Sequence, residues 1–142
     1  LKDGTKKMSK SEISDLSRIN LTDDSELIVN KIKKAKTDPD PLPSNVNELK
    51  ERPEARNLLG IYSSLNNSNI EKTINEFEGK NFSEFKVKLS QILVEKINPI
   101  SKEINKLIAD KKFLDQILSD GHKKANIIAS QKLKKMQEII GF

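Results

Sequence analysis

The sequence predicts an all-α fold, a helical bundle-like domain preceded by a short loop segment, and three observations support this prediction. The 142-residue chain is 35% hydrophobic and 33% charged but only 4% aromatic, which suits amphipathic helices better than a β-sandwich. It contains five glycines and five prolines, so few turns interrupt it. Apolar residues recur at the spacing of one helix face over much of its length.

The composition also limits the possible functions. A net charge of +5 and a pI near 9.3 fit a polyanionic partner. Nearly all the basic residues are lysines, which bind phosphate as point charges and rarely read base edges. The absence of cysteine excludes disulfides and thiolate metal sites and agrees with a cytoplasmic protein. No apolar run approaches the roughly 18 residues of a membrane span, and there is no secretory signal.

Residues 1–21 are predicted to be the end of a preceding domain that carries a cationic loop. The chain starts with Leu1 rather than methionine, and Leu1–Asp3 read as the end of a strand, so we expect a carboxy-terminal piece of a longer protein. Asp3-Gly4 favours a tight turn. The segment that follows, Lys7-Met8-Ser9-Lys10-Ser11, gathers ammonium groups and hydroxyls that suit a polyphosphate. The alternative for this segment is a solvated tail.

The first helix is predicted over about residues 22–36. Thr22 is the expected N-cap, and the acidic residues behind it match the positive end of the helix dipole. Four lysines crowd the C-terminal end, where cations suit the dipole, so they fit either this structural role or phosphate contact: Lys31, Lys33, Lys34 and Lys36. Four apolar positions are expected to be buried: Leu27, Ile28, Ile32 and Ala35.

Prolines at alternate positions make residues 37–53 a predicted loop. A helix is expected from Pro53, because proline is tolerated in a first turn, with Leu58, Leu59, Ile61, Tyr62 and Leu65 as its apolar positions. Ser68 or Asn69 should cap the next, short helix, and Gly79 should end it. That short helix is expected to bury Ile70, Ile74 and Phe77.

Ser83 is expected to open the longest helix, whose apolar stripe continues past a kink at Pro99. The stripe reaches Leu118, and Asp120-Gly121 is predicted to break the helix. A final helix over about residues 123–140 should bury Ala125, Ile128, Ala129, Leu133, Met136 and Ile140. Its lysines lie mostly off this stripe, where both a solvated face and an RNA-binding face fit: Lys123, Lys124, Lys132, Lys134 and Lys135.

The pentapeptide Lys7–Ser11 resembles the KMSKS motif of class I aminoacyl-tRNA synthetases. Later segments resemble the carboxy-terminal region of the bacterial tryptophanyl-tRNA synthetases, in that family's order and at close to its spacing. These segments are Asn57–Ser63, Phe77–Lys80 with Phe85–Leu89 and Asn98–Ile100, and Gly121–Asn126 leading into Ile127–Ser130. The resemblance covers essentially the whole chain. One departure is Glu12-Ile13, where the family often has Asp-Pro.

The resemblance implies that residues 1–21 end a Rossmann-type catalytic domain with the mobile motif loop, and that residues 22–142 form a helical anticodon-binding domain. The full-length enzyme would be a homodimer that activates tryptophan with ATP and magnesium and transfers it to tRNA(Trp). Lys7 and Lys10 would be catalytic, and the whole motif would contact the ATP phosphates: Lys7, Met8, Ser9, Lys10 and Ser11. Candidate tRNA contacts are Lys123, Lys124 and Lys132, with Lys33 and Lys34 as a second choice.

Amino-acid activation is the attack of a carboxylate on the α-phosphate of ATP, and it depends on positioning and on neutralising developing charge. The motif lysines can do this, but the resemblance implies that the tryptophan pocket is missing, so the isolated chain is expected to be inactive and to bind no ATP. No metal site is expected, and the only histidine, His122, reads as a surface or capping residue. Two alternatives stay open: a non-catalytic helical RNA-binding or interaction module, and a class I synthetase for another amino acid.

Overall fold

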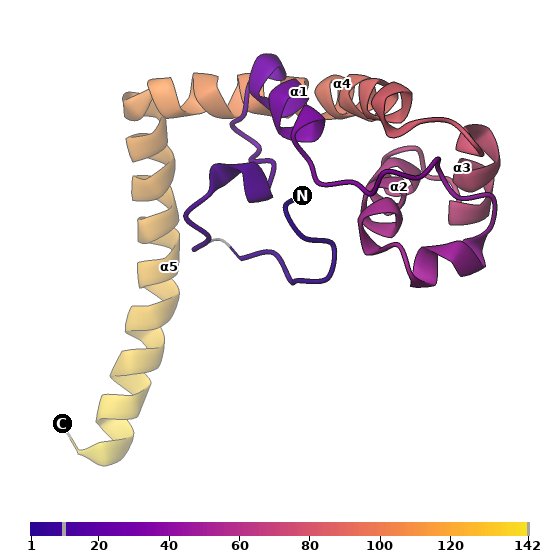
Figure 1. Ribbon diagram of the computed structural model, residues 1–142. Helices are drawn as coiled ribbons and strands as arrows, with labels where there is room; N and C mark the ends of the chain where they lie inside the picture. The colour runs from indigo at the N-terminus through magenta and orange to yellow at the C-terminus, as the bar shows by residue number, and fades with distance from the viewer. Residues whose placement is uncertain (10, 142) are drawn as a thin grey trace. The chain divides into compact units, whose positions relative to one another are not determined.

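A computed structural model describes residues 1–9 and 11–141, and in this part of the chain all regular elements are helical (Figure 1). The predicted all-α fold is therefore confirmed. None of the helices in the described residues is long and apolar enough to cross a membrane. The elements are η1 (Asp15–Ser17), α1 (Ser25–Lys33), η2 (Val46–Lys50), α2 (Pro53–Leu65), α3 (Ile70–Phe77), α4 (Phe82–Ala109) and α5 (Lys111–Ile140), where η is a 3-10 helix.

The chain divides into two compact units, Leu1–Lys102 and Glu103–Phe142. The first unit contains η1 to α3 and most of α4, and the second contains the end of α4 and all of α5. A boundary after residue 21, between the end of a catalytic domain and a helical domain, stays a prediction.

The core of the first unit lies among α1, α2, α3 and α4. Tyr62, Phe77 and Phe85 form an aromatic cluster, with ring centroids 4.8 to 5.7 Å apart and the Phe77 ring nearly perpendicular to the other two. Such edge-to-face pairs add to the stabilisation from area burial. The aliphatic residues of this core come mainly from the predicted apolar stripes: Ile28, Ile32, Ala35, Leu42, Leu49, Ala55, Leu58, Leu59, Ile74, Leu89 and Leu93. Leu27 and Ile70, predicted to be buried, are half-buried.

Local signals explain where most of the helices begin and end. Pro53 opens α2 as predicted. Asn69 caps α3 by accepting a hydrogen bond from the Lys72 amide at 2.8 Å, and Gly79 follows α3 with φ of +69°, so both predictions are confirmed. The N-cap of α1 was predicted wrongly: it is Asp24, not Thr22, because the Asp24 carboxylate accepts from the Leu27 amide at 2.8 Å.

The long segment between α1 and α2 contains η2 and no α-helix, in agreement with its prolines. Arg52 holds this segment together, since its guanidinium pairs with the Asp38 carboxylate and donates to the Pro41 carbonyl at 2.7 Å. Lys86 on α4 donates to the carbonyls of Lys33 and Ala35, at 3.2 and 2.7 Å, and so binds the C-terminal end of α1. Burial lowers the pKa of Lys86.

The two carboxy-terminal helices differ from the prediction. α4 continues past Pro99 as predicted, but it ends at Ala109, and Asp110 caps α5 by accepting from the Phe113 amide at 3.0 Å. The predicted break at Asp120-Gly121 is wrong, because α5 runs through both residues. A glycine inside a helix costs only about 1 kcal/mol relative to alanine, so good helix formers around it outweigh this cost.

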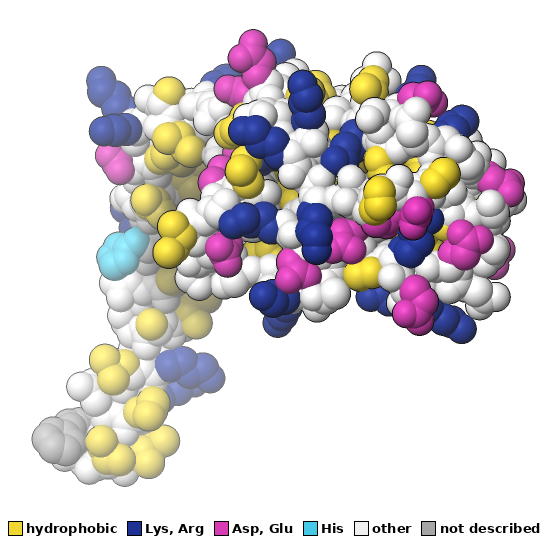
Figure 2. Space-filling model, viewed as in Figure 1, with side chains coloured by type: hydrophobic (Ala, Val, Ile, Leu, Met, Phe, Trp, Pro, Cys, Tyr) yellow, Lys and Arg dark blue, Asp and Glu magenta, His cyan; other side chains and the backbone are white. Residues whose placement is uncertain are grey.

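The predicted burial along the final helix is also wrong for the chain as it stands. Ile128, Met136 and Ile140 are 63–67% exposed, and α5 contains no buried residue. Ala125, Ala129 and Leu133, which were predicted to be buried with them, are exposed too. A helix cannot cover its own apolar stripe, and Figure 2 shows hydrophobic side chains open to solvent along this helix.

Candidate nucleotide-phosphate loop

The predicted phosphate loop lies at the surface of the first unit. Lys7, Met8, Ser9 and Ser11 are exposed, and the first three line a hollow of about 300 Å³ together with residues of the chain start. Lys10, the second predicted catalytic lysine, lies outside the described residues. The structure thus places Lys7 beside a hollow with solvent access, where a polyphosphate can approach.

The approach to the loop is fixed by contacts with η1, with the segment after α1 and with the start of α2. The Leu1 carbonyl accepts from the Lys36 amide, and the Leu1 amino group donates to the Ser17 carbonyl, both at 3.0 Å. Gly4 packs so closely on the start of α2 that a Cβ here would lie 2.6 Å from the carbonyl carbon and oxygen of Pro53. Only glycine fits without a backbone shift.

The predicted turn at Asp3-Gly4 is confirmed and has its own hydrogen bonds. The Asp3 carboxylate accepts from the Thr5 amide at 2.9 Å and from the Thr5 hydroxyl at 2.6 Å, which lowers the pKa of Asp3. Beside this turn, Lys36 forms a 2.8 Å ion pair with Glu54 at the start of α2. The segment that leads into the loop is therefore held by the packing of Gly4 on α2 and by the hydrogen bonds between Asp3 and Thr5.

The two motif serines face each other. The Oγ atoms of Ser9 and Ser11 are 2.8 Å apart, and the Ser11 amide donates to Ser9 Oγ at 3.3 Å. The Ser9 carbonyl accepts from the Glu12 amide, also at 3.3 Å. The two hydroxyls are therefore close together, and the one that accepts in this bond keeps its own hydrogen free to donate to a phosphate oxygen.

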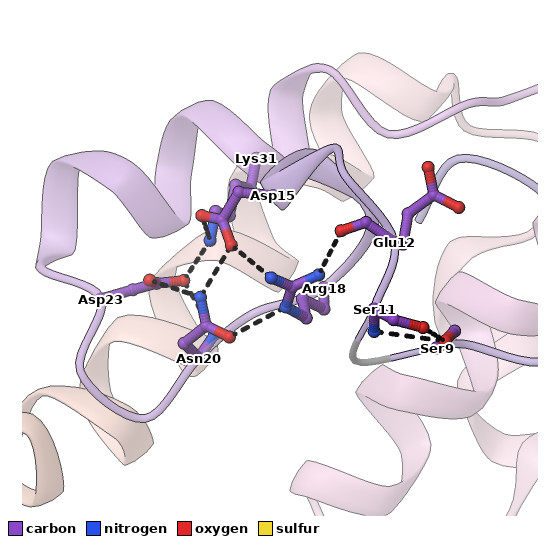
Figure 3. Close-up of polar contacts among 8 residues, drawn as sticks. All are labelled: Ser9, Ser11, Glu12, Asp15, Arg18, Asn20, Asp23 and Lys31. Carbon is purple, nitrogen blue, oxygen red and sulfur yellow. Dashed lines mark hydrogen bonds and ion pairs between the residues drawn. The ribbon is translucent and has the colours of Figure 1, made fainter.

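Arg18 holds the exit of the loop (Figure 3). Its guanidinium donates to the Glu12 carbonyl at 3.1 Å and to Asn20 Oδ1 at 3.2 Å, and it pairs with Asp15 at 3.3 Å. One planar side chain thus joins the residue directly after the motif to η1 and to the extended segment that follows η1.

A buried lysine of α1, Lys31, binds the segment that contains Asp15 and Arg18 to this helix. Lys31 has no exposed side-chain surface, and its Nζ lies 2.6 Å from a carboxylate oxygen of Asp15 and 2.6 Å from one of Asp23 (Figure 3). Burial alone would lower the pKa of Lys31, but the hydrogen bonds and charges of the two carboxylates outweigh it, and the pKa is raised. The hydrogen bond from Lys31 lowers the pKa of Asp15.

Asn20 closes the same network. Its amide side chain donates to Asp15 at 2.9 Å and to Asp23 at 3.3 Å, and its backbone N–H donates to Asp23 at 2.8 Å. Both carboxylates therefore have a cation and additional donors, which is the condition under which a buried ion pair is tolerated.

The prediction of Lys31 as a cation for the helix end or for phosphate contact is wrong, because its side chain is buried and paired with Asp15 and Asp23. One signal of this network was present in the sequence. Lys31 lies three residues after Ile28 and next to Ile32, on the buried stripe of α1, where a solvated lysine is out of place. A charged residue on a buried stripe needs a partner, and the nearby aspartates before α1 were candidates.

The other predicted sites lie outside the loop. Lys123, Lys124 and Lys132 are exposed on α5, and Lys123 lies 3.7 Å from Asp120. Lys33 and Lys34 are exposed at the end of α1, and His122 is an exposed residue within α5. Within the described ranges, no group of three or more His, Cys, Asp or Glu residues is placed to hold a metal ion.

Comparison with known proteins agrees with these features. The sequence model of the family described as tRNA synthetases class I (W and Y) matches residues 1–98. The chain is 49% identical over 142 residues to the tryptophan–tRNA ligase of Brucella melitensis, 51% over 142 to that of Agrobacterium fabrum, and 48% over 142 to that of Rickettsia felis. These alignments cover 100% of this chain and 40, 40 and 42% of the relatives, so the chain spans about two fifths of their length. With 98 of its 142 residues matched by the family model, the chain belongs to the class I tRNA synthetases of the tryptophan and tyrosine group.

Proposed function

We propose that the chain is the carboxy-terminal part of a tryptophan–tRNA ligase, which activates tryptophan with ATP and transfers it to tRNA(Trp). The observation that carries the proposal is the identity of about one half, over all 142 residues, to proteins named as tryptophan–tRNA ligases. The exposed motif residues Lys7, Met8, Ser9 and Ser11 lie on a segment held before and after the motif, and this supports the proposal because such a segment suits contact with a polyphosphate.

In this proposal the loop acts on the phosphates of ATP while the tryptophan carboxylate attacks the α-phosphate and pyrophosphate leaves. Lys7 and Lys10 are the catalytic lysines, and they neutralise charge that develops on the leaving pyrophosphate. Ser9 and Ser11, with nearby backbone N–H groups, donate to phosphate oxygens. Magnesium enters with ATP as part of the substrate.

The remaining assignments belong to the same proposal. Residues 1–21 end the catalytic domain, and residues 22–142 form the helical domain that meets the tRNA anticodon. The full-length protein acts in the cytoplasm as a homodimer, and it contributes the tryptophan pocket that this chain lacks. The 142-residue chain alone therefore supports no amino-acid activation.

The test is ATP–pyrophosphate exchange by the full-length protein, with tryptophan and tyrosine compared as substrates. We expect exchange with tryptophan only, and severe slowing in Lys7→Ala and Lys10→Ala, each by about two to three orders of magnitude if the lysine acts like an oxyanion donor. Tryptophan affinity should change little, because the loop acts on phosphate. Lys88→Ala, at an exposed lysine of α4, is the control and should retain full exchange.

Two outcomes would contradict the proposal. Exchange that depends on tyrosine would assign the chain to a synthetase for another amino acid. A full-length protein that binds tRNA but exchanges pyrophosphate with neither amino acid would be a non-catalytic RNA-binding module.

A further inference from the structure

We propose that Arg18 is a positioning residue for the phosphate loop, held in place by Asp15 and, through it, by the buried Lys31. This inference rests on the proposed function, because it assigns Arg18 a part in ATP activation. Arg18 lies seven residues after the last motif residue and reaches back to the loop exit. It acts through the Glu12 carbonyl and contacts no substrate itself.

A continuous series of contacts connects the core of the first unit to the loop. It begins at Lys31, which projects from the buried face of α1 and pairs with Asp15 at 2.6 Å. Asp15 pairs with Arg18 at 3.3 Å, and Arg18 donates to the Glu12 carbonyl at 3.1 Å. The Glu12 amide donates in turn to the Ser9 carbonyl inside the motif.

The chemistry of the guanidinium explains why an arginine occupies this place. A guanidinium presents several donors in one plane and can bind a carbonyl, an amide oxygen and a carboxylate at once, as Arg18 does with Glu12, Asn20 and Asp15. A lysine at this position would keep the charge next to Asp15 but would lack the fixed fork. Arg18 is only partly exposed, so its geometry is better defined than that of a free surface side chain.

The position of the loop exit affects the rate because a catalytic group acts fully only in the correct geometry. Without Arg18, the segment after Ser11 loses the hydrogen bond that holds the Glu12 carbonyl in place. The loop then samples positions in which Lys7 no longer meets the phosphates in the transition state. The expected defect is a lower kcat for exchange at saturating ATP, with tryptophan affinity unchanged.

The experiment measures ATP–pyrophosphate exchange for Arg18→Ala, Arg18→Lys, Lys7→Ala and the double variant Arg18→Ala/Lys7→Ala in the full-length protein. We expect Arg18→Ala to lower kcat by about 10- to 100-fold while KM for tryptophan stays unchanged. Arg18→Lys should be nearly as slow, although it keeps the charge and an intact fold. Arg56→Ala, at an exposed arginine of α2, is the matched control and should behave like the wild type.

The double variant tests whether Arg18 acts through the loop. In the Lys7→Ala background, Arg18→Ala should cost less than it does alone, because one of the groups that it positions is already gone. Full additivity of the two losses, or full activity in Arg18→Lys, would overturn the inference while leaving the proposed function intact. Undiminished exchange in Lys7→Ala would overturn this inference and the catalytic role proposed for Lys7, but not the proposed ligase activity.

Discussion

Asp15 is the residue whose ionisation links the loop exit to the core, because it pairs with both Arg18 and Lys31. The hydrogen bond from buried Lys31 lowers the pKa of Asp15 below its ordinary value of 3.8, so its contribution to stability is present above that pH and is lost as the pH falls through the lowered pKa. The pKa of Lys31 is raised above 10.5, so the contribution of this lysine is present below that pH and is lost only as the pH rises through the raised pKa.

The lowered pKa of Asp15 and the raised pKa of Lys31 predict the pH range in which Asp15→Asn destabilises the protein. The variant should unfold at lower urea concentration than the wild type between about pH 5 and 9, where both partners are charged in the wild type. The difference should narrow as the pH falls from 3.8 through the lowered pKa of Asp15, where the carboxylate of the folded wild type also becomes protonated. Urea unfolding of the 142-residue chain at several pH values measures it, and Asp115→Asn, at an exposed residue of α5, is the control. A difference that does not change with pH would show that Asp15 contributes only by packing.

Gly121 permits a test of helix α5 as an element. The structure has Gly121 in a continuous helix, with no atom within 4 Å of an added Cβ. Gly121→Ala should therefore stabilise this part of α5 by about 1 kcal/mol, which is roughly a five-fold increase in the protection of nearby amides from hydrogen exchange. Gly79→Ala is the opposite control, because φ there is +69° and alanine is strained in that conformation. Unchanged protection around residue 121 would mean that the helix is interrupted there after all.

The same elements show how far sequence reasoning reaches. Helix ends with one strong local signal were predicted correctly, as at Pro53, Asn69 and Gly79. The position of the break between α4 and α5 was predicted wrongly. Asp110 and Asp120-Gly121 are both residues typical of a helix boundary, and the boundary lies where a side chain actually caps an amide, which is at Asp110.

In the candidate site, too, features encoded in neighbouring residues could be predicted from the sequence, whereas features that depend on distant contacts could not. The loop at Lys7–Ser11 could be proposed as a site from the sequence because its motif consists of consecutive residues. Arg18 and Lys31 were missed because their roles depend on contacts six to sixteen residues apart, with Glu12 and Asp15, and no local pattern fixes such pairs. Packing along α5 was overestimated, because periodicity shows which face is apolar but not whether another element covers it.

The net charge of the whole chain is positive, at +5, and on the visible face of the first unit basic side chains alternate with acidic ones (Figure 2). Binding of tRNA through such a surface would depend mainly on where the phosphates meet lysines rather than on total charge. The proposed contacts on α5, Lys123, Lys124 and Lys132, are exposed and belong to the second unit.

A charge-matched comparison distinguishes a local tRNA contact from a general effect of net charge. Replacing Lys123, Lys124 and Lys132 together by Gln in the full-length protein should raise KM for tRNA and flatten its salt dependence, because fewer counterions are released on binding. Adenylate formation should stay intact, since the phosphate loop is unchanged. The control replaces three exposed lysines of the first unit, Lys50, Lys72 and Lys88, and removes the same total charge. If both triple variants change the salt slope equally, tRNA responds to the overall field of the protein, and α5 is not the contact. A larger change in the α5 variant alone would assign the RNA-binding face to that helix.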